Sequence, residues 1–225
     1  MSAMDVDTDG HGRAGARIAG LVREAILDGA YAPGARIRQE DLADRYKASR
    51  VPVREALRIL ESEGLITRVA NAGAWVSQLN LAECEELYQV RERIEPLLLR
   101  LNVPLLTPGA IDELDKLAGS MEAAADAEEF LALDRRFHLA TYAAAPTIML
   151  HETVVRLWNR THHYRRAFVR VARSTGDASA HHDHRLLVAA LRRRDADEAE
   201  SIIAHHIRRT RLELARHPEI FADPS

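Results

Sequence analysis

Three histidines and one aspartate have the side-chain types and the spacing of a metal site. Asp134 and His138 lie four residues apart, so one face of a helix would present both of them. His184 and His206 each recur with apolar residues at helical spacing, so we expect both to point inward. Buried imidazole and carboxylate groups are costly unless they are paired or bound to a metal. The set favours a divalent transition metal, with zinc expected first and nickel or manganese as alternatives.

Two other interpretations of these histidines stay open at this point. Each histidine could be a core residue hydrogen-bonded to a neighbour, because the chain contains 11 histidines and chance alignment is a real risk. The pair His182-Asp183 is also typical of helical metal-dependent hydrolases, although no second His-Asp pair accompanies it at a suitable spacing. Periodicity does distinguish two neighbours, since His206 aligns with the apolar face of its helix and His205 with the polar face.

Arg91 is a second candidate for ligand chemistry. It shares a helical face with Leu87, Ile94 and Leu98, and a buried arginine without a partner is costly. Either Glu95, one helical turn further on, neutralises it, or Arg91 binds the carboxylate of an effector. The residues alone leave both alternatives open, and Asn159 and His163 are further candidates for the effector pocket.

A helix predicted over residues 50–63 would carry a basic face opposite an apolar one. Arg50, Arg54 and Arg58 follow each other at intervals of four residues. Arginines at the start of a recognition helix can read guanine in the major groove or hold phosphates. Ser49, at the helix N-terminus, can add a phosphate contact. The alternative is a solvated basic surface without a partner.

The elements around this helix have the order of a winged helix-turn-helix. Helical periodicity spans residues 18–26 and 40–46, and Gly64 ends the helix that starts after Ser49. Residues 65–69 and 74–77 are rich in β-formers, and residues 70–73 between them predict a hairpin loop, which is the wing. We therefore assign residues 13–79 to a DNA-binding domain, preceded by a disordered tail over residues 1–12.

Beyond Asn80 only helical patterns follow, with breaks at prolines and at Gly176. The six expected helices span residues 81–102, 109–124, 127–144, 147–172, 178–193 and 195–216. We expect an all-α antiparallel six-helix bundle over residues 80–217, large enough to enclose a pocket, and a tail over residues 218–225. The fold class is therefore mainly α, with one small β-hairpin wing.

Composition and charge are compatible with this division. Residues 13–77 contain eleven Lys or Arg and eight Asp or Glu, whereas the whole chain has a net charge of −3. The basic N-terminal third suggests a DNA contact, although the overall charge does not. The single cysteine, Cys84, excludes an intrachain disulfide, and no signal peptide or membrane span is visible, so we expect a cytoplasmic protein without a membrane partner.

The motifs of the N-terminal third resemble the GntR family of bacterial repressors. The resemblance is carried by Pro33-Gly34, residues 40–43, residues 49–57 and residues 63–66. It implies that the positions of Ser49, Arg50, Pro52, Arg54 and the wing tip contact DNA. With further arginines of this basic third added, the residues expected to bind DNA are Arg38, Ser49, Arg50, Pro52, Arg54, Arg58, Asn71 and Gly73.

The C-terminal part resembles the FCD effector domain of the FadR/FCD subfamily. The resemblance is carried by residues 133–138, 183–185 and 204–207, and it implies that Asp134, His138, His184 and His206 bind a metal. It also implies a regulator rather than an enzyme, one that senses small organic acids. We thus expect an effector-controlled repressor that binds a palindromic operator as a homodimer. A metal-dependent hydrolase and a structural metal in a dimerisation domain without an effector are the alternatives.

Overall fold

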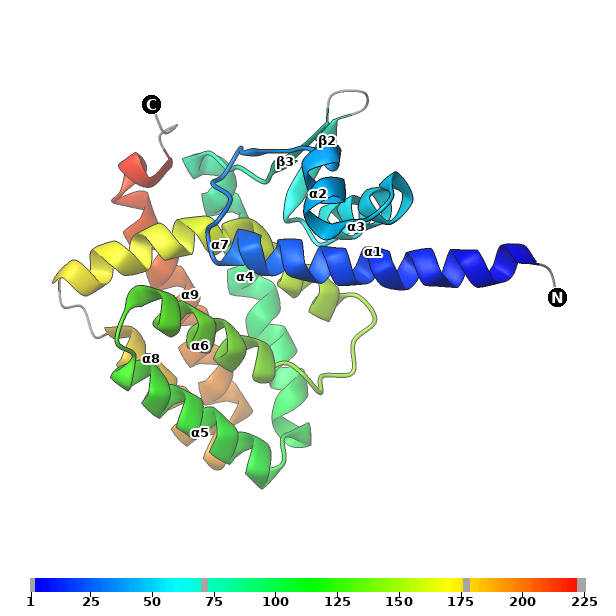
Figure 1. Ribbon diagram of the computed structural model, residues 1–225. Coiled ribbons are helices and arrows are strands. Elements are labelled where there is room, and N and C mark those ends of the chain that lie inside the picture. Colours follow the sequence, from blue (N-terminus) through cyan, green and yellow to red (C-terminus); the bar gives the residue numbers. More distant parts are fainter. Residues whose placement is uncertain (1–2, 70–72, 176–178, 222–225) are drawn as a thin grey trace. The chain divides into compact units, whose positions relative to one another are not determined.

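The computed structural model describes residues 3–69, 73–175 and 179–221, and it is mainly helical, as predicted (Figure 1). The chain divides into two compact units. The first comprises residues 1–78 together with Trp158–His163, and the second comprises residues 79–157 and 164–225.

Three helices form the frame of the first unit: α1 (Ala3–Leu27), α2 (Gln39–Tyr46) and α3 (Arg50–Ser62). Helix α1 packs against α3, and Ile18, Val22 and Leu57 are buried in the core between them. Pro52 lies in the first turn of α3, where its missing N–H has no helical partner in any case. Gly64 follows the helix with φ 76°, a conformation that glycine adopts without strain.

In the part of the chain that the structure describes, the wing contains three strands, one more than we expected. Strands β2 (Ile66–Val69) and β3 (Gly73–Val76) form the predicted antiparallel hairpin, and β1 (Arg36–Ile37) pairs with the other edge of β3. Two residues are too few to show a strand periodicity, which is why β1 was missed. Residues 70–72 of the predicted hairpin loop, including Asn71, lie outside the described residues.

Helix α1 begins well before the point that periodicity indicated. Its first residue is Ala3, within the segment 1–12 that we expected to be a tail without secondary structure. An existing helix can extend at its end because each added residue makes one more backbone hydrogen bond, even without an apolar face. The apolar pattern marks only the part of α1 that packs against α3.

Within its described residues, the second unit is built from six helices, in agreement with the prediction. They are α4 (Leu81–Asn102), α5 (Pro108–Ala123), α6 (Ala127–Ala140), α7 (Leu150–Thr175), α8 (Ser179–Arg192) and α9 (Ala196–Ala215). Two 3-10 turns, η1 (Val103–Leu105) and η2 (Pro218–Phe221), follow α4 and α9. Asn80 and Glu83 form a reciprocal capping box at the start of α4.

The end of α6 and both ends of α7 (Leu150–Thr175, against the expected 147–172) differ from the expected boundaries by at least three residues. Helix α6 ends at Ala140 and α7 starts at Leu150, so the connection between them is longer than predicted. Pro146 lies in that connection, and proline disfavours helical backbone in the residue before it. Within the predicted C-terminal tail, Phe221 stacks on Tyr164 with the ring centroids 4.7 Å apart.

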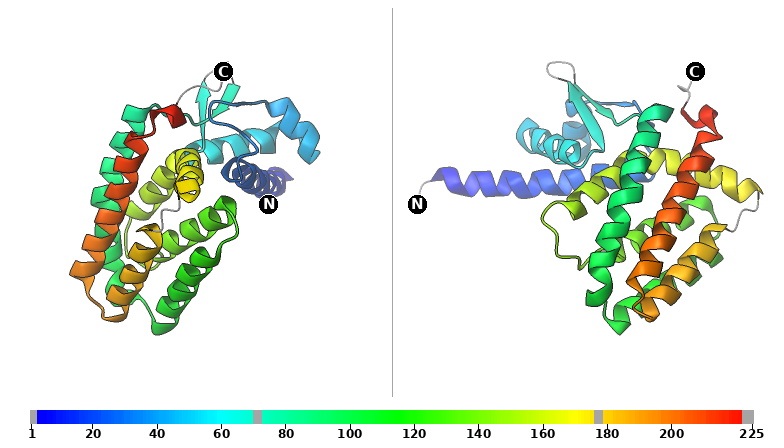
Figure 2. Two further views of the ribbon diagram at one scale, coloured as in Figure 1. Left: turned by 90° about the vertical axis from the view of Figure 1, so that its left-hand side faces the viewer. Right: turned by 180° about the vertical axis from the view of Figure 1, so that it is seen from behind.

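The long helices α4 and α9 lie side by side and run in opposite directions (Figure 2). Helix α8 packs on α9 and on α5, which in turn packs on α6. The bundle core is aliphatic and aromatic, with Leu98, Phe137 and Tyr142 among its most buried residues. No helix in the described part of the chain combines the length and the hydropathy needed to cross a membrane.

Candidate metal centre, effector pocket and DNA-binding face

Helices α6, α8 and α9 bring the four predicted metal ligands together. One ligand atom from each of Asp134, His138, His184 and His206 lies within 4.8 Å of all the others. None of the four side chains is more than 3% exposed. The Nε2 atoms of His138 and His184 lie 3.2 Å apart, and each lies 3.5 Å from Asp134 Oδ1. Asp134 and His206 are 72 positions apart in the chain, yet all four residues form one compact donor set.

The donor set fits a divalent transition metal. Two atoms bound to one zinc ion at about 2.1 Å lie about 3.4 Å apart in a tetrahedral arrangement. His206 supplies a further test, because its Nε2 is buried and has no hydrogen-bond partner among the described residues. Its Nδ1 lies 3.1 Å from Asp183 Oδ2. This carboxylate holds the proton on Nδ1, so the lone pair is on Nε2, as a metal ligand requires.

The charges of the cluster also suit a cation. Burial by itself raises the pKa of the Asp134 carboxyl, but the Arg165 guanidinium and His138 outweigh it and hold that pKa well below its usual range. Burial lowers the pKa of His184 well below its usual value. Burial also lowers the pKa of His206, to about 4, although its hydrogen bond to Asp183 opposes the shift. At neutral pH the aspartate is therefore charged and these two histidines are neutral, which are the ligand forms.

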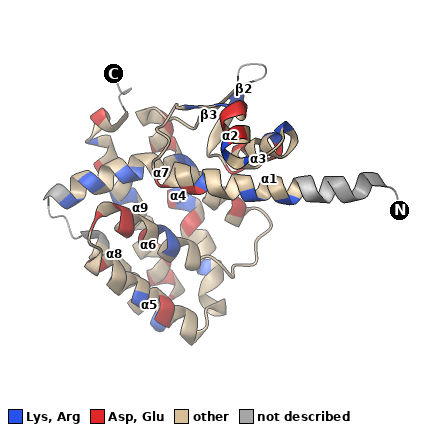
Figure 3. Ribbon diagram, viewed as in Figure 1, with Lys and Arg blue, Asp and Glu red and all other residues tan. Residues whose placement is uncertain are grey.

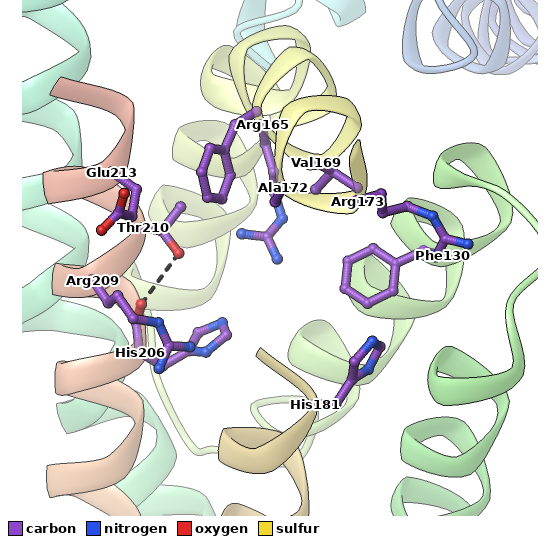
Figure 4. A pocket seen from close by; sticks show the side chains of 11 residues that line it. Phe130, Arg165, Val169, Ala172, Arg173, His181, His206, Arg209, Thr210 and Glu213 are labelled. Atoms are coloured by element: carbon purple, nitrogen blue, oxygen red, sulfur yellow. Dashed lines mark hydrogen bonds between the residues drawn. The ribbon is translucent and has the colours of Figure 1, made fainter. Parts of the chain in front are cut away.

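A pocket adjoins the cluster, and His206 belongs to both. Its empty volume is about 560 Å³, a figure that includes space open to solvent. Figure 4 shows the Arg165 guanidinium pointing from α7 into the space between His206 and Phe130. The lining residues are Phe130, Arg165, Phe168, Val169, Ala172, Arg173, His181, His206, Arg209, Thr210 and Glu213. The pocket therefore offers three arginines beside an apolar wall.

Arginines recur along α7, which has six of them (Figure 3). Arg165 donates from Nε and Nη2 to the two carboxylate oxygens of Asp134, over 2.9 and 2.6 Å. Arg209 on α9 lies 2.5 Å from Asp183 Oδ2. Two of the three pocket arginines are thus held by carboxylates of the candidate metal centre.

The structure places the predicted effector residues elsewhere. Arg91 donates from Nε to Glu95 Oε1 over 2.6 Å, and both side chains are buried. The ion pair with Glu95 that we left open as the alternative is therefore present, and Arg91 does not line the pocket. Asn159 and His163 belong to the stretch of α7 that clusters with the first unit, and neither lines the pocket. A role of these three residues toward an effector remains a prediction without support from the pocket geometry.

Arg165, Arg173 and Arg209 line the pocket but were not among the residues predicted for it. A periodic pattern could have identified Arg165, because it continues the buried stripe of Val154, Trp158 and Thr161 at intervals of three and four residues. No comparable pattern marks Arg209, whose side chain is 34% exposed and enters the pocket through tertiary packing.

The basic face of α3 is present in the first unit. Arg50, Arg54 and Arg58 are all exposed, whereas Val53 and Leu57 are buried. Arg58 forms a two-bond ion pair with Glu55, over 3.0 and 2.7 Å. Within the described residues, Arg50 and Arg54 have no acidic group within ion-pairing distance, so their charges face solvent. The helix therefore exposes two basic groups in its first turns.

The other predicted DNA-binding residues in the described part of the chain lie around the starts of α2, α3 and β3. Ser49 is the N-cap residue of α3, is exposed, and makes no capping hydrogen bond through its side chain, so its hydroxyl is available to a phosphate. Arg38 is exposed at the start of α2, and Gly73 begins β3. Pro52 is buried, so it shapes the first turn of α3 rather than presenting a surface for base contact.

The comparisons with known proteins cover both units. A family model described as "Bacterial regulatory proteins, gntR family" matches residues 14–76, and the FCD domain model matches residues 86–209. The HTH-type transcriptional regulator McbR of Escherichia coli (strain K12) is 31% identical over 190 residues, covering 81% of this chain and 84% of the relative. The gluconate operon transcriptional repressor of Bacillus licheniformis is 28% identical over 197 residues, covering 81% and 77%.

A solved structure agrees with the sequence relatives. The structure titled E. coli McbR/YncC superposes with a TM-score of 0.75 at 25% sequence identity, covering 91% of this chain and 98% of that chain. The winged helix-turn-helix and the helical second unit define this protein as a DNA-binding transcriptional regulator. The chain belongs to the GntR family and carries an FCD domain. It is not an enzyme, so the hydrolase suggested by His182-Asp183 is ruled out by the family.

Proposed function

We propose that this regulator is a repressor that binds a palindromic operator as a homodimer and releases it when a small organic acid occupies the FCD-domain pocket. The observation that carries the proposal is the shared residue His206, which belongs to the metal-ligand cluster and also lines a pocket with three arginines. An anionic ligand placed there meets positive charge from the side chains and reaches the cluster directly.

The exposed start of α3 supports operator binding. Arg50 and Arg54 would enter the major groove and hydrogen-bond to base edges or phosphates. Ser49 and the first backbone N–H groups of α3 would hold a phosphate at the helix N-terminus. Arg58, which is paired with Glu55, would contribute less unless that pair opens.

Asp134, His138, His184 and His206 would hold the metal, with zinc as the first expectation and nickel or manganese as alternatives. A bound divalent metal supplies a Lewis-acidic centre to which a carboxylate oxygen can coordinate. Arg165 and Arg209 would orient the same carboxylate through charge-assisted hydrogen bonds. Phe130, Val169 and Ala172 would pack against the apolar part of the acid.

An apolar stripe on α4 supports the homodimer. Leu87, Val90, Ile94, Leu97 and Leu101 follow each other at alternating intervals of three and four residues, which is the spacing of a coiled-coil seam. Val90, Leu97 and Leu101 are 40%, 43% and 39% exposed, so the described residues leave this face partly open to solvent. We propose that α4 of a second copy packs on it, because a two-fold dimer matches a palindromic operator.

Control by the acid requires that it bind differently to two arrangements of the dimer. An acid that binds the operator-competent and the released arrangement equally well shifts nothing, however tight its binding is. A tenfold preference for the released arrangement changes operator affinity tenfold, about 1.4 kcal/mol. The pocket residues must therefore differ in position between the two arrangements.

In vitro selection from random duplex DNA tests the operator directly. The full-length protein should enrich a palindromic sequence, bind it in excess unrelated DNA, and lose affinity steeply as salt rises. A panel of small carboxylic acids is then added to the zinc-loaded complex, with matched alcohols and amines as controls. Release by an acid, lost when a chelator removes the metal, supports the proposal. Failure to enrich any sequence contradicts the operator part, and stable DNA complexes with every acid favour a structural metal without an effector.

A further inference from the structure

We propose that Asp183 is a positioning residue that couples the metal ligand His206 to the pocket arginine Arg209. This inference rests on the proposed metal and effector site. In it, the Asp183 carboxylate orients both the metal-binding imidazole of His206 and the anion-binding guanidinium of Arg209. The sequence patterns mark Asp183 as the neighbour of a predicted ligand, but they do not show its partners, which lie on another helix.

Helix geometry explains why Asp183 and His184 play different parts. Consecutive residues of an α-helix point about 100° apart, so the two side chains leave α8 in different directions. His184 points at the ligand cluster, with its Nε2 3.2 Å from that of His138. Asp183 instead faces α9, on which α8 packs. Helix α8 thus supplies a ligand from one position and an orienting group from the position before it.

A single oxygen atom of Asp183 makes both contacts. Its Oδ2 accepts from Nδ1 of His206 at 3.1 Å and lies 2.5 Å from Nη2 of Arg209. His206 and Arg209 are three residues apart on α9, so they lie on one face of that helix. The Asp183 side chain is only 19% exposed, so both contacts are partly shielded from water and from salt.

The first consequence concerns the tautomer of His206. A neutral imidazole carries one proton, and the group that accepts it decides which nitrogen keeps a lone pair. Asp183 takes the Nδ1–H, which leaves the buried Nε2 as the donor atom toward Asp134, His138 and His184. Without the carboxylate, the tautomer with the proton on Nε2 competes, and that tautomer cannot bind a metal from Nε2.

The second consequence concerns Arg209. The Arg209 side chain is one third exposed and lines the pocket. The bond to Asp183 restricts it beside His206, whose other nitrogen belongs to the ligand set. A displacement of His206 is therefore transmitted through Asp183 to a residue of the anion pocket, and the reverse also holds.

A test in the metal-free protein examines the tautomer alone. Nitrogen NMR of the full-length protein labelled in histidine should show His206 protonated on Nδ1 in the unsubstituted chain. Asp183→Ala should shift His206 toward protonation on Nε2. The matched control is Asp115→Ala, because Asp115 also bridges two arginines, Arg185 and Arg192, but lies away from the cluster. An unchanged His206 signal in Asp183→Ala would overturn the proposal, and so would an equal shift in Asp115→Ala.

Zinc affinity, measured by competition with a chelator, tests whether Asp183 supports metal binding by His206. Loss of a carboxylate that orients a metal-binding histidine weakens binding by about 10- to 100-fold, and we expect that loss in Asp183→Ala. Asp183→Glu, which keeps an acceptor oxygen, should recover most of the affinity, and Asp115→Ala should match the unsubstituted protein. If the unsubstituted protein binds no zinc, the proposed metal site fails. If it binds zinc and Asp183→Ala binds it equally well, only the role of Asp183 fails.

Acetate serves as a minimal carboxylate probe for the coupling between Asp183 and Arg209. Titrated into zinc-saturated protein, it should bind about tenfold more weakly to Arg209→Met and to Asp183→Ala, because each loses one charge-assisted hydrogen bond in the intended geometry. Arg209→Met should keep its zinc affinity, since His206 retains its partner. Acetate affinity that is unchanged in both variants overturns the coupling to Arg209.

Discussion

Arg165 binds Asp134 through two parallel hydrogen bonds, from Nε to Oδ2 at 2.9 Å and from Nη2 to Oδ1 at 2.6 Å. The pair joins α7 to α6, and neither side chain is more than 5% exposed. Because Arg165 also lines the pocket, the predicted metal ligand Asp134 and the proposed effector pocket are linked by one ion pair. In the metal-free protein, the Arg165 guanidinium is the main counter-charge of the buried Asp134 carboxylate.

Replacing Arg165 should therefore destabilise the metal-free protein strongly. Arg165→Met leaves the Asp134 carboxylate buried without its main counter-charge, and breaking a buried pair in this way costs about 3–5 kcal/mol. Urea unfolding in the presence of a chelator measures the loss, and added zinc should restore part of it. The control is Arg170→Met, which removes a solvent-exposed pair with Glu128 and should cost at most about 1 kcal/mol. Equal losses in the two variants would contradict a special role of Arg165.

Replacing Arg54 should weaken operator recognition without disturbing the metal site. Arg54→Ala removes an exposed, unpaired guanidinium from the start of α3, and one bidentate contact to a base contributes about 1–3 kcal/mol, or about 5- to 150-fold in affinity. Fluorescence anisotropy with the selected operator measures the change, and metal content should stay constant. Arg100→Ala, which removes an arginine from the other unit, should leave operator affinity unaltered. An operator affinity that does not respond to Arg54→Ala means that α3 is not the reading helix.

His205 and His206 provide a matched pair for the metal site. His206 is buried in the ligand cluster, while His205 is exposed and hydrogen-bonds to Ser201 on its own helix. His206→Ala should reduce bound zinc and abolish stabilisation by added zinc, which amounts to about 2.7 kcal/mol at a hundredfold excess over the dissociation constant. His205→Ala should change neither quantity. The reverse result, with His205 required and His206 dispensable, would disprove the ligand set.

Charges on the α4 stripe should separate the proposed dimer. Leu97 and Leu101 are exposed on one chain, so placing Asp at both positions should leave the folded chain intact but place like charges in the seam. Sedimentation should show a monomer, and affinity for the palindromic operator should fall because two half-sites no longer bind together. Leu186→Asp, on an exposed site of α8, is the control. A dimer that persists in the double variant assigns the interface to another face.

Cys84 should be unreactive in the folded protein. Burial raises the pKa of its thiol to about 12, and Glu85 adds to the shift although Arg91 opposes it. The thiolate is the nucleophile, so iodoacetamide at pH 8 should modify the folded chain far more slowly than the urea-unfolded chain. Rapid modification of the native protein would show that α4 opens at this position.

Most of the fold follows from local sequence patterns. Apolar residues at helical spacing, together with glycine and proline breaks, predict the six bundle helices, and the β-formers on each side of residues 70–73 predict the hairpin. The start of α1, the two-residue strand β1 and the ends of α6 and α7 were not predictable in this way. These boundaries depend on backbone hydrogen bonds and on pairing with distant residues, for which no periodic pattern exists.

For the site, the sequence by itself determined which residues can be ligands and on which helical face they lie. Asp134, His138, His184 and His206 each share a face with buried apolar residues, and that periodicity is a property of a single helix. Only the tertiary structure decided which charges surround them. It paired Arg91 with Glu95 and brought Arg165 to Asp134 and Arg209 to Asp183. Partners on different helices are chosen by how those helices pack, and packing is a relation between segments that no single segment encodes.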